Sequence, residues 1–278
     1  MVRGLTRGEG SQGGLILNAT CSIGASDRAL FPQLDRLCAV GAPLLLMPRR
    51  YAIAALKAWG HVSAWLLRVL IGTRVEVRGV EKIPQGPLLV ASKHQSAFET
   101  FALAPLFDDT VLVLKRELNR IPLFSLWTRK FGMIAVDRSR GVRSLKKLAT
   151  DAREAFALGR QLIIFPEGTR RTPGAAPDYK IGATYIYDNA DVPCLPVALN
   201  SGVFWPRRSF LKYPGKIVVE ILDPIPPGLD RKAFDERLEQ AIEEASDRLL
   251  VEAASQPFVP PLPDVAQARL AELGHLPR

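Results

Sequence analysis

Cysteine is rare in this 278-residue chain, and its three copies lie far apart in the sequence. Cys21, Cys38 and Cys194 show neither a zinc-binding spacing nor the pattern of a disulfide framework. We therefore expect a protein of a reducing compartment, in which the cysteines are packing residues rather than nucleophiles.

The motifs of several other enzyme classes are also missing. His61, His94 and His275 share no metal-ligand spacing, which predicts that the chain has no metal site. No glycine-rich loop of the Walker or dinucleotide type follows an apolar run, and no G-x-S-x-G elbow is present. These absences argue against nucleotide-binding and serine-hydrolase chemistry, and we expect no cofactor.

The charge balance is strongly basic, with a formal net charge of +9. Hydrophobic residues make up 47% of the chain and charged residues 23%, which is enough apolar material for a packed core of one large domain or two small ones. A basic surface predicts an anionic partner, which is nucleic acid, an acidic bilayer or a phosphorylated substrate.

Residues 1–41 show no lasting periodicity, and Gly, Ser and Thr dominate the first half of this stretch. They lack the compact apolar stretch and cleavage site of a signal peptide. We expect a poorly ordered N-terminal extension over residues 1–46. Met47 precedes the first strong helical pattern, so it is a candidate for the native start of the protein.

Residues 47–73 are predicted to form a helix at a membrane surface. The apolar run 51–71 is interrupted by a basic stripe, because Arg50, Lys57, His61 and Arg68 fall on one side of a helical wheel. Charged side chains in mid-span argue against a lipid-exposed crossing, whereas a basic stripe with Trp at its sides favours the interface. The alternative is an ordinary amphipathic helix packed on the domain. In either case His61 is expected at the surface, without a catalytic role.

Residues 74–255 alternate between strand and helix patterns, which predicts an α/β fold with a mixed, largely buried sheet flanked by helices. Predicted strands cover residues 74–78, 87–92, 110–114, 133–136, 162–165, 195–199 and 216–222. Predicted helices cover residues 98–106, 122–130, 141–158 and 234–254. The remainder, 256–278, contains many prolines and is expected to be a surface tail with a short helix at 265–273.

The stretch 91–100 carries the first candidate for chemistry. His94 stands where a buried strand should end, and Ser96 with Glu99 matches a helix capping box. A histidine and a carboxylate facing each other across such a turn suit a general base and the acid that orients it. The alternative is that Glu99 only caps the helix and His94 only satisfies a local hydrogen bond.

A second motif changes the balance between these alternatives. Residues 162–170 form an apolar strand that enters a Pro-Glu-Gly turn with Arg170 at its mouth. Together with the H-x4-acid box at His94, with residues 132–138 and with residues 192–197, this order of motifs resembles the glycerolipid acyltransferase family, and most closely its bacterial 1-acylglycerol-3-phosphate acyltransferases. The resemblance covers roughly residues 79–223. It departs from the family's commonest box at Glu99, which replaces the usual Asp and is one methylene longer.

The resemblance implies acyl transfer from a thioester to the free hydroxyl of 1-acylglycerol 3-phosphate, which gives phosphatidic acid. His94 would be the base and Glu99 its orienting acid, while Arg138 and Arg170 would hold the phosphate of lysophosphatidic acid; guanidinium suits phosphate because it binds bidentately. The implied acyl donor is acyl-CoA or acyl carrier protein. The implied location is the cytoplasmic face of the cell membrane.

The remaining candidates concern the same turn and its surroundings. Glu167 would hold the glycerol end of the acceptor, Gly168 would let the backbone approach, and Thr169 is a further candidate contact. Asp137 is expected to be a structural partner of a nearby Arg or backbone group. Additional electrostatic attraction for phosphate or coenzyme A is expected from Lys115, Arg116, Arg171 and Lys180. The alternative is that these residues are ordinary surface charges.

Two rival functions remain open at this level. The first is acylation of another lysolipid, whose head group without a phosphomonoester would leave Arg138 and Arg170 unexplained. The second is a basic module that binds membrane or nucleic acid without catalysis. Because the basic residues are scattered rather than interleaved with aromatics, we expect no nucleic-acid partner.

Overall fold

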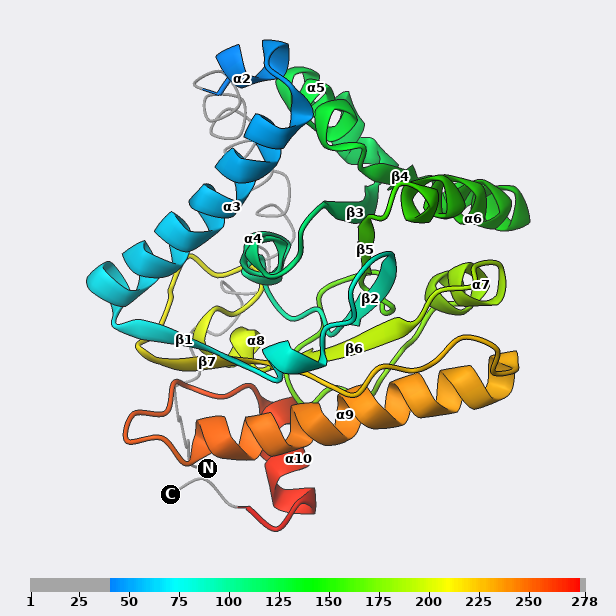
Figure 1. The fold of residues 1–278 in the computed structure, drawn as a ribbon. Coiled ribbons are helices and arrows are strands. Elements are labelled where there is room, and N and C mark those ends of the chain that lie inside the picture. The colour runs from blue at the N-terminus through cyan, green and yellow to red at the C-terminus, as the bar shows by residue number, and fades with distance from the viewer. Residues whose placement is uncertain (1–40, 276–278) are drawn as a thin grey trace, which may run out of the picture.

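The structure is a computed structural model that describes residues 41–275, apart from the side chains at positions 122, 123 and 140. Its centre is one twisted sheet covered by helices on both faces (Figure 1). The prediction of a poorly ordered extension falls almost entirely on residues outside the described range. Of that extension, the structure describes the short helix α2 (Pro43–Leu46).

The sheet of the described residues has seven strands in the order β1-β7-β6-β2-β5-β3-β4. Neighbouring strands are parallel except β6 and β7, which are antiparallel. Each predicted strand matches an observed one within one residue at either end, which confirms the mixed α/β sheet. The strands are β1 (Thr73–Arg78), β2 (Leu88–Ser92), β3 (Thr110–Lys115), β4 (Ile134–Val136), β5 (Gln161–Ile164), β6 (Cys194–Leu199) and β7 (Gly215–Ile221).

The central strand β2 shows that the sheet is buried on both faces. All five of its residues are buried, and they alternate between two cores. Leu88 and Val90 belong to one cluster, whereas Leu89 and Ala91 belong to the other. Four consecutive apolar residues, rather than an apolar residue at every second position, are typical of a strand that is covered on both sides.

Helices pack on both faces of this sheet. The longest of the described helices, α9, begins at the side-chain cap of Asp230, which accepts a hydrogen bond from the Ala233 N–H at 2.9 Å. It runs along β6 and β7 below the sheet in Figure 1. Besides α2, the α-helices of the described residues are α3 (Arg49–Leu66), α4 (Glu99–Ala102), α5 (Pro122–Phe131), α6 (Gly141–Ala157), α7 (Gly182–Asp188), α8 (Ser201–Phe204), α9 (Arg231–Ala254) and α10 (Asp264–Glu272). Shorter or non-α turns are η1 (Leu67–Ile71), η2 (Val80–Lys82), η3 (Ala104–Leu106), η4 (Arg116–Arg120) and η5 (Arg138–Arg140).

The helix predicted over residues 98–106 is not continuous. It is split into α4 and the 3₁₀ turn η3. The break comes from Pro105, which has no N–H to donate to the carbonyl of Phe101 four residues earlier. The predicted capping box is also only half formed. The Glu99 carboxylate does accept from the Ser96 N–H, but the Ser96 hydroxyl accepts from the Phe98 N–H at 2.9 Å instead of capping the Glu99 N–H.

Helix α3 packs on the domain and also keeps an exposed apolar side. Ala52, Ile53 and Gly60 are buried, and a Cβ on Gly60 would lie 2.8 Å from the Phe101 carbonyl oxygen. Only glycine therefore allows the close approach of α3 to the segment that follows the His94 turn. Among the described residues, no helix is both long and apolar enough to cross a bilayer.

The proline-containing segment after residue 255 is more than a surface tail. Its helix α10 matches the predicted helix at 265–273 within one residue at either end, and it buries Ala266 and Leu270. Both side chains belong to the same core cluster as Leu250 and Ala253 of α9. This segment is therefore part of the packed domain that carries the site.

Candidate active site

The parallel part of the sheet brings the sequence motifs to one edge. Strands β2, β5 and β6 are neighbours and run in the same direction, so their carboxyl ends meet at this edge. His94 follows β2, the Pro-Glu-Gly turn follows β5, and Ser201 follows β6. The motifs that the sequence predicted to act together are thus brought together by strand order.

His94 and Glu99 face each other across the turn after β2. The His94 Nδ1 atom lies 3.8 Å from Glu99 Oε2, and it is buried without a hydrogen-bond partner among the described residues. The imidazole stacks on the ring of Phe165, with ring centroids 4.0 Å apart and planes inclined by 17°. The His94 carbonyl accepts a hydrogen bond from the Arg171 N–H at 2.7 Å. The Pro-Glu-Gly segment therefore holds His94 through both its ring and its backbone.

Glu99 is fully buried and is surrounded by donors. Its carboxylate accepts from the backbone N–H of Gln95 at 2.9 Å, from that of Ser96 at 3.0 Å and from the Ser201 hydroxyl at 2.6 Å. Burial by itself would raise the pKa of this carboxyl, but His94, Ser201 and Gln95 hold the pKa below its ordinary value. The group is therefore kept as an anion beside the imidazole.

Ser201 and Gln95 are site residues that the sequence did not reveal. Ser201 is the first residue of α8, and the Gly202 N–H next to it donates to the Gln95 side-chain oxygen at 3.0 Å. These two contacts tie the turn after β2 to the end of β6. The only local signal is that Ser201 follows the end of a predicted strand, next to Asn200.

Glu167 does not have the position expected of a glycerol-binding residue. Its side chain is buried, and its Oε1 accepts from the Lys93 ammonium at 3.0 Å. Burial raises the pKa of Glu167, while Lys93 opposes that effect. The other oxygen, Oε2, is buried without a partner among the described residues. The structure thus gives Glu167 the role of an internal ion-pair partner rather than a contact in the open site.

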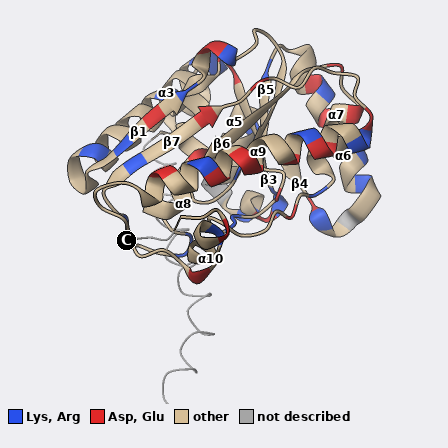
Figure 2. Cartoon of the chain, turned by 90° about the horizontal axis from the view of Figure 1, so that it is seen from below, with Lys and Arg blue, Asp and Glu red and all other residues tan. Residues whose placement is uncertain are grey.

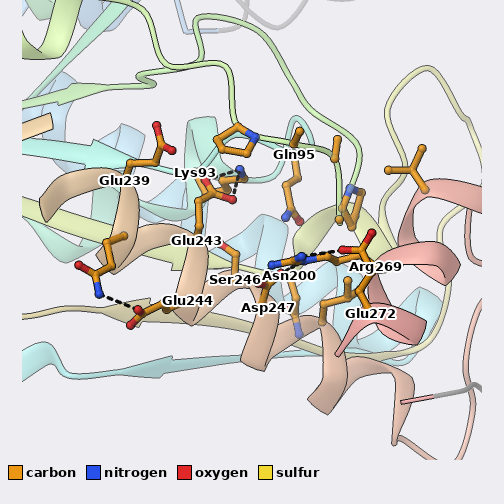
Figure 3. Close-up of a pocket in the computed structure, with 18 of the residues that line it drawn as sticks. Lys93, Gln95, Asn200, Glu239, Glu243, Glu244, Ser246, Asp247, Arg269 and Glu272 are labelled. Carbon is orange, nitrogen blue, oxygen red and sulfur yellow. Dashed lines mark hydrogen bonds and ion pairs between the residues drawn. The ribbon is translucent and has the colours of Figure 1, made fainter. Parts of the chain in front are cut away.

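Lys93, directly after β2, links this edge of the sheet to α9. Its ammonium also donates to both carboxylate oxygens of Glu243, at 2.7 and 2.9 Å (Figure 3). The Tyr179 hydroxyl donates to the same carboxylate at 2.8 Å. Because Lys93 and Glu243 are 150 positions apart, no local sequence pattern indicates this pair.

A cavity of about 780 Å³ lies on the α9 side of this ion pair. Most of its charged lining is acidic, and Arg269 is already paired there with Asp247 and Glu272 (Figure 3). His94 and Arg170 are not among its lining residues. An acidic cavity is a poor match for the phosphate that the sequence motifs predict, so the candidate site lies on the His94 side of the edge.

Arg138 and Gly168 are in direct contact. The Arg138 guanidinium donates to the Gly168 carbonyl, and Gly168 has a φ of 63°, which favours glycine. Thr169 is exposed and Arg170 is half-buried. No hydrogen bond or ion pair joins the Arg170 guanidinium to any other residue in the part of the chain that the structure describes. The predicted substrate-binding residues Arg138, Gly168, Thr169 and Arg170 therefore lie close together. Glu167 belongs to the same turn, but its side chain is buried.

Arg207 adds a further cation to this group. Its guanidinium donates to the Arg170 carbonyl at 2.6 Å. Burial lowers the pKa of Arg207, and repulsion from Arg208, Arg170 and Arg171 lowers it further. Several guanidinium groups thus gather beside the Gly168 turn, and an anion would relieve their repulsion.

Other predicted residues have structural partners. Asp137 accepts from the Ser139 hydroxyl and from Arg116 at 2.6 Å each, and these contacts lower its pKa to about 2. This confirms Asp137 as a partner of a nearby Arg. Lys115 pairs with Glu117 and Lys180 with Asp178 at the surface. Burial raises the pKa of the Cys194 thiol, which fits a packing residue, while Cys21 and Cys38 lie outside the described residues.

The chain is similar to known acyltransferases in sequence and in fold. The family model "Acyltransferase" matches residues 74–200. A 1-acyl-sn-glycerol-3-phosphate acyltransferase of Pseudomonas aeruginosa is 42% identical over 180 residues, which are 65% of this chain and 70% of that protein. The alpha isoform of the mouse enzyme with the same name is 30% identical over 162 residues, or 57% of each chain.

A solved structure shows the same fold. The crystal structure of the 1-acyl-sn-glycerophosphate acyltransferase of Thermotoga maritima superposes with a TM-score of 0.62 at 24% identity. The match covers 72% of this chain and 80% of that one. The layered sheet with helices on both faces is therefore a fold that this enzyme also has.

Proposed function

The chain belongs to the family of 1-acyl-sn-glycerol-3-phosphate acyltransferases, and from this premise we propose how its own residues perform acyl transfer. The substrate to be acylated is 1-acylglycerol 3-phosphate, and the product is phosphatidic acid. The observation that carries the proposal is the buried, hydrogen-bonded Glu99 carboxylate facing His94 Nδ1 at 3.8 Å.

His94 acts as the general base. Its Nδ1 side faces Glu99, so Nε2 is the atom that takes the proton of the acceptor hydroxyl. The hydroxyl oxygen then attacks the thioester carbonyl, a C–O bond forms, and the C–S bond breaks as the imidazolium returns its proton to the leaving thiolate. Glu99 stabilises the imidazolium and acts as a positioning residue. A separation of 3.8 Å is compatible with this role, because catalytic hydrogen bonds often tighten only in the reacting complex.

The phosphate of the acceptor binds to the arginines beside Gly168. Among the described residues, the Arg170 guanidinium has no partner, and the guanidinium groups of Arg138 and Arg207 donate only to backbone carbonyls. Guanidinium groups that no carboxylate neutralises favour a phosphomonoester over a zwitterionic or uncharged head group. This supports lysophosphatidic acid over other lysolipids as the acceptor.

The acyl donor in this proposal is acyl-CoA or acyl carrier protein. Both present a thioester and negative charge, and the net charge of +9 suits both. No nucleic acid is part of the proposal.

The protein works at the cytoplasmic face of the cell membrane, to which α3 binds peripherally. The helix contains Arg, Lys and His but no Asp or Glu, whereas α9 carries acidic and basic side chains along its length (Figure 2). Next to the basic stripe, in which Arg50, His61 and Arg68 are exposed and Lys57 is half-buried, α3 exposes Tyr51, Val62, Trp65 and Leu66. A basic stripe beside an exposed aromatic and aliphatic face is typical of a helix that lies in an anionic interface.

One assay tests both the reaction and its acceptor. Purified protein is given either acyl-CoA or acyl carrier protein, each charged with a labelled acyl group as its thioester, and a panel of lysolipids with different head groups. We expect labelled phosphatidic acid from 1-acylglycerol 3-phosphate, little product from lysolipids without a phosphomonoester, and none above background for His94→Ala. A preference for lysophosphatidylcholine or a lyso-aminolipid would overturn the acceptor assignment.

A further inference from the structure

We propose that residues 205–214 form a second membrane-insertion element, whose tip enters an anionic bilayer next to α3. The inference rests on the proposed function only in that it assumes a lipid-bound acceptor. It concerns residues outside the helix discussed above, and it names an anionic lipid surface as the binding partner.

The tip of this loop is apolar and exposed. Phe210 is 88% exposed and Leu211 is 64% exposed. Two large apolar side chains in succession at a loop tip cost solubility unless something covers them. Isolated exposed apolar residues are ordinary, but this pair projects from a loop whose two ends are held in place.

Both ends of the loop are fixed beside α3 and the start of β1. At one end, the Trp205 ring lies 5.9 Å from the Phe101 ring, which is 5.3 Å from Trp59 of α3. At the other end, the Tyr213 carbonyl accepts from the Thr73 hydroxyl at 2.8 Å. The chain just before Thr73 is η1, which exposes Val69 and Leu70. The loop therefore adjoins the exposed apolar end of the α3 region.

Basic side chains surround the apolar tip. Arg207 and Arg208 precede Phe210, Lys212 follows Leu211, and residues 205–214 contain no acidic residue. The Lys212 ammonium lies over the Trp205 ring at 4.5 Å. Apolar side chains flanked by cations match a bilayer with anionic head groups, because the tip is withdrawn from water while the cations stay at phosphate level.

The inner end of the loop touches the candidate site. Arg207 donates to the Arg170 carbonyl at 2.6 Å, three positions before Phe210. A loop that contacts lipid at its tip and the phosphate-binding turn at its base would place the entrance for the acceptor at the membrane surface. Loss of tip contact should therefore raise the KM for an acceptor presented in vesicles.

The test compares loop variants with a matched control on the full-length protein. Binding to phosphatidylcholine vesicles, with and without phosphatidylglycerol, is measured for wild type, for Phe210→Ser/Leu211→Ser and for Leu158→Ser. Leu158 is 65% exposed at the end of α6, which packs near β4 and β5, at the other end of the sheet. We expect the double variant to bind anionic vesicles at least about tenfold more weakly, and Leu158→Ser to bind like wild type.

The charges are tested separately. Arg208→Gln and Lys212→Gln should each reduce the gain from phosphatidylglycerol by about fivefold, without changing binding to neutral vesicles. The proposal would be overturned if Phe210→Ser/Leu211→Ser bound anionic vesicles as tightly as the wild type does. It would also be overturned if the wild-type protein did not bind anionic vesicles.

A second readout separates this inference from the proposed function. With a short-chain, monomeric acceptor, Phe210→Ser/Leu211→Ser should keep the wild-type kcat and KM, while KM for vesicle-borne acceptor should rise. A wild-type protein that binds vesicles through the loop but acylates neither acceptor would refute the enzymatic assignment alone. A double variant with unchanged KM on vesicles would refute the loop proposal alone.

Discussion

Two buried glutamates follow neighbouring strands of the sheet, and their pKa values are shifted in opposite directions. Glu99 follows β2 and Glu167 follows β5, and neither carboxylate reaches solvent. Glu99 accepts from two backbone amides and the Ser201 hydroxyl, and its pKa is held low against burial. Glu167 depends chiefly on Lys93, one of its oxygens lacks a partner within the described residues, and burial keeps its pKa raised.

The difference shows that burial does not determine the role of a carboxylate. Glu99 is surrounded by fixed donors before any reaction occurs, so it can stabilise a positive imidazole without reorganisation. Glu167 shares the Lys93 ammonium with Glu243, and this shared cation connects the Gly168 turn to α9. We infer that one glutamate serves the proton transfer and the other holds the scaffold of the site.

The largest expected effect comes from removing the cation that Glu167 depends on. Lys93→Met should lower the free energy of unfolding by about 3–5 kcal/mol, because it leaves buried carboxylate charge uncompensated. Urea unfolding measures this, with Lys232→Met as a control. The Lys232 side chain is 86% exposed, and among the described residues it pairs only with Glu236 at the surface, so that variant should differ little from wild type. A Lys93→Met protein of wild-type stability would contradict the structural role of Glu167.

The next effect concerns the other glutamate. Glu99→Gln can still accept from the amides of Gln95 and Ser96, but it cannot stabilise an imidazolium by charge. Turnover should fall roughly a hundredfold or more, with little change in acceptor KM. Glu154→Gln, at an exposed position of α6, is the control and should keep full activity. Full activity in Glu99→Gln would mean that this carboxylate only organises the turn.

The third prediction concerns Arg170, which follows Glu167 in the same turn and is proposed to bind the acceptor phosphate. Arg170→Ala should raise the acceptor KM by roughly ten- to a hundredfold and leave kcat nearly unchanged, if it binds the phosphate equally in ground and transition states. Steady-state kinetics with 1-acylglycerol 3-phosphate measure this against Arg153→Ala, which removes an exposed arginine of α6. Normal acceptor kinetics in Arg170→Ala would remove this residue from the site.

The smallest effect is a difference in the pH dependence of stability. The raised pKa of Glu167 means that its burial costs little at acid pH and more as pH rises above the ordinary value of 4.5. Glu167→Gln should therefore gain stability relative to wild type as pH rises. The lowered pKa of Glu99 has the opposite sign, so Glu99→Gln should gain relative to wild type as pH falls below 4.5. Urea unfolding across this range would refute the comparison if both variants shifted in the same direction.

The sequence was sufficient for the strands and for the group of motifs at one edge. Apolar runs bounded by Gly and Pro identified β2 and β5, and parallel pairing then places His94 beside the Glu167 turn. The short helix α7 (Gly182–Asp188) was missed, because seven residues are too few to show a helical period.

Long-range partners could not be predicted in this way. Ser201 is 102 positions from Glu99, and Glu243 is 150 positions from Lys93, so no window of the sequence contains either pair. Glu167 was predicted to contact substrate because the turn around it matches a binding motif. Its side chain points into the protein instead, because it pairs there with the Lys93 ammonium, which lies 74 positions away in the sequence and comes near only in the folded chain.

The coupling between His94 and Glu99 tests the central claim most directly. Turnover is measured for His94→Ala, for Glu99→Gln and for the double variant, each shown to be folded and to bind the lysolipid. The account predicts a loss of roughly 10²–10⁴-fold for His94→Ala and a double variant that is scarcely worse, because Glu99 acts through His94. Losses that multiply in the double variant, or a His94→Ala protein that loses only thermal stability, would contradict the claim.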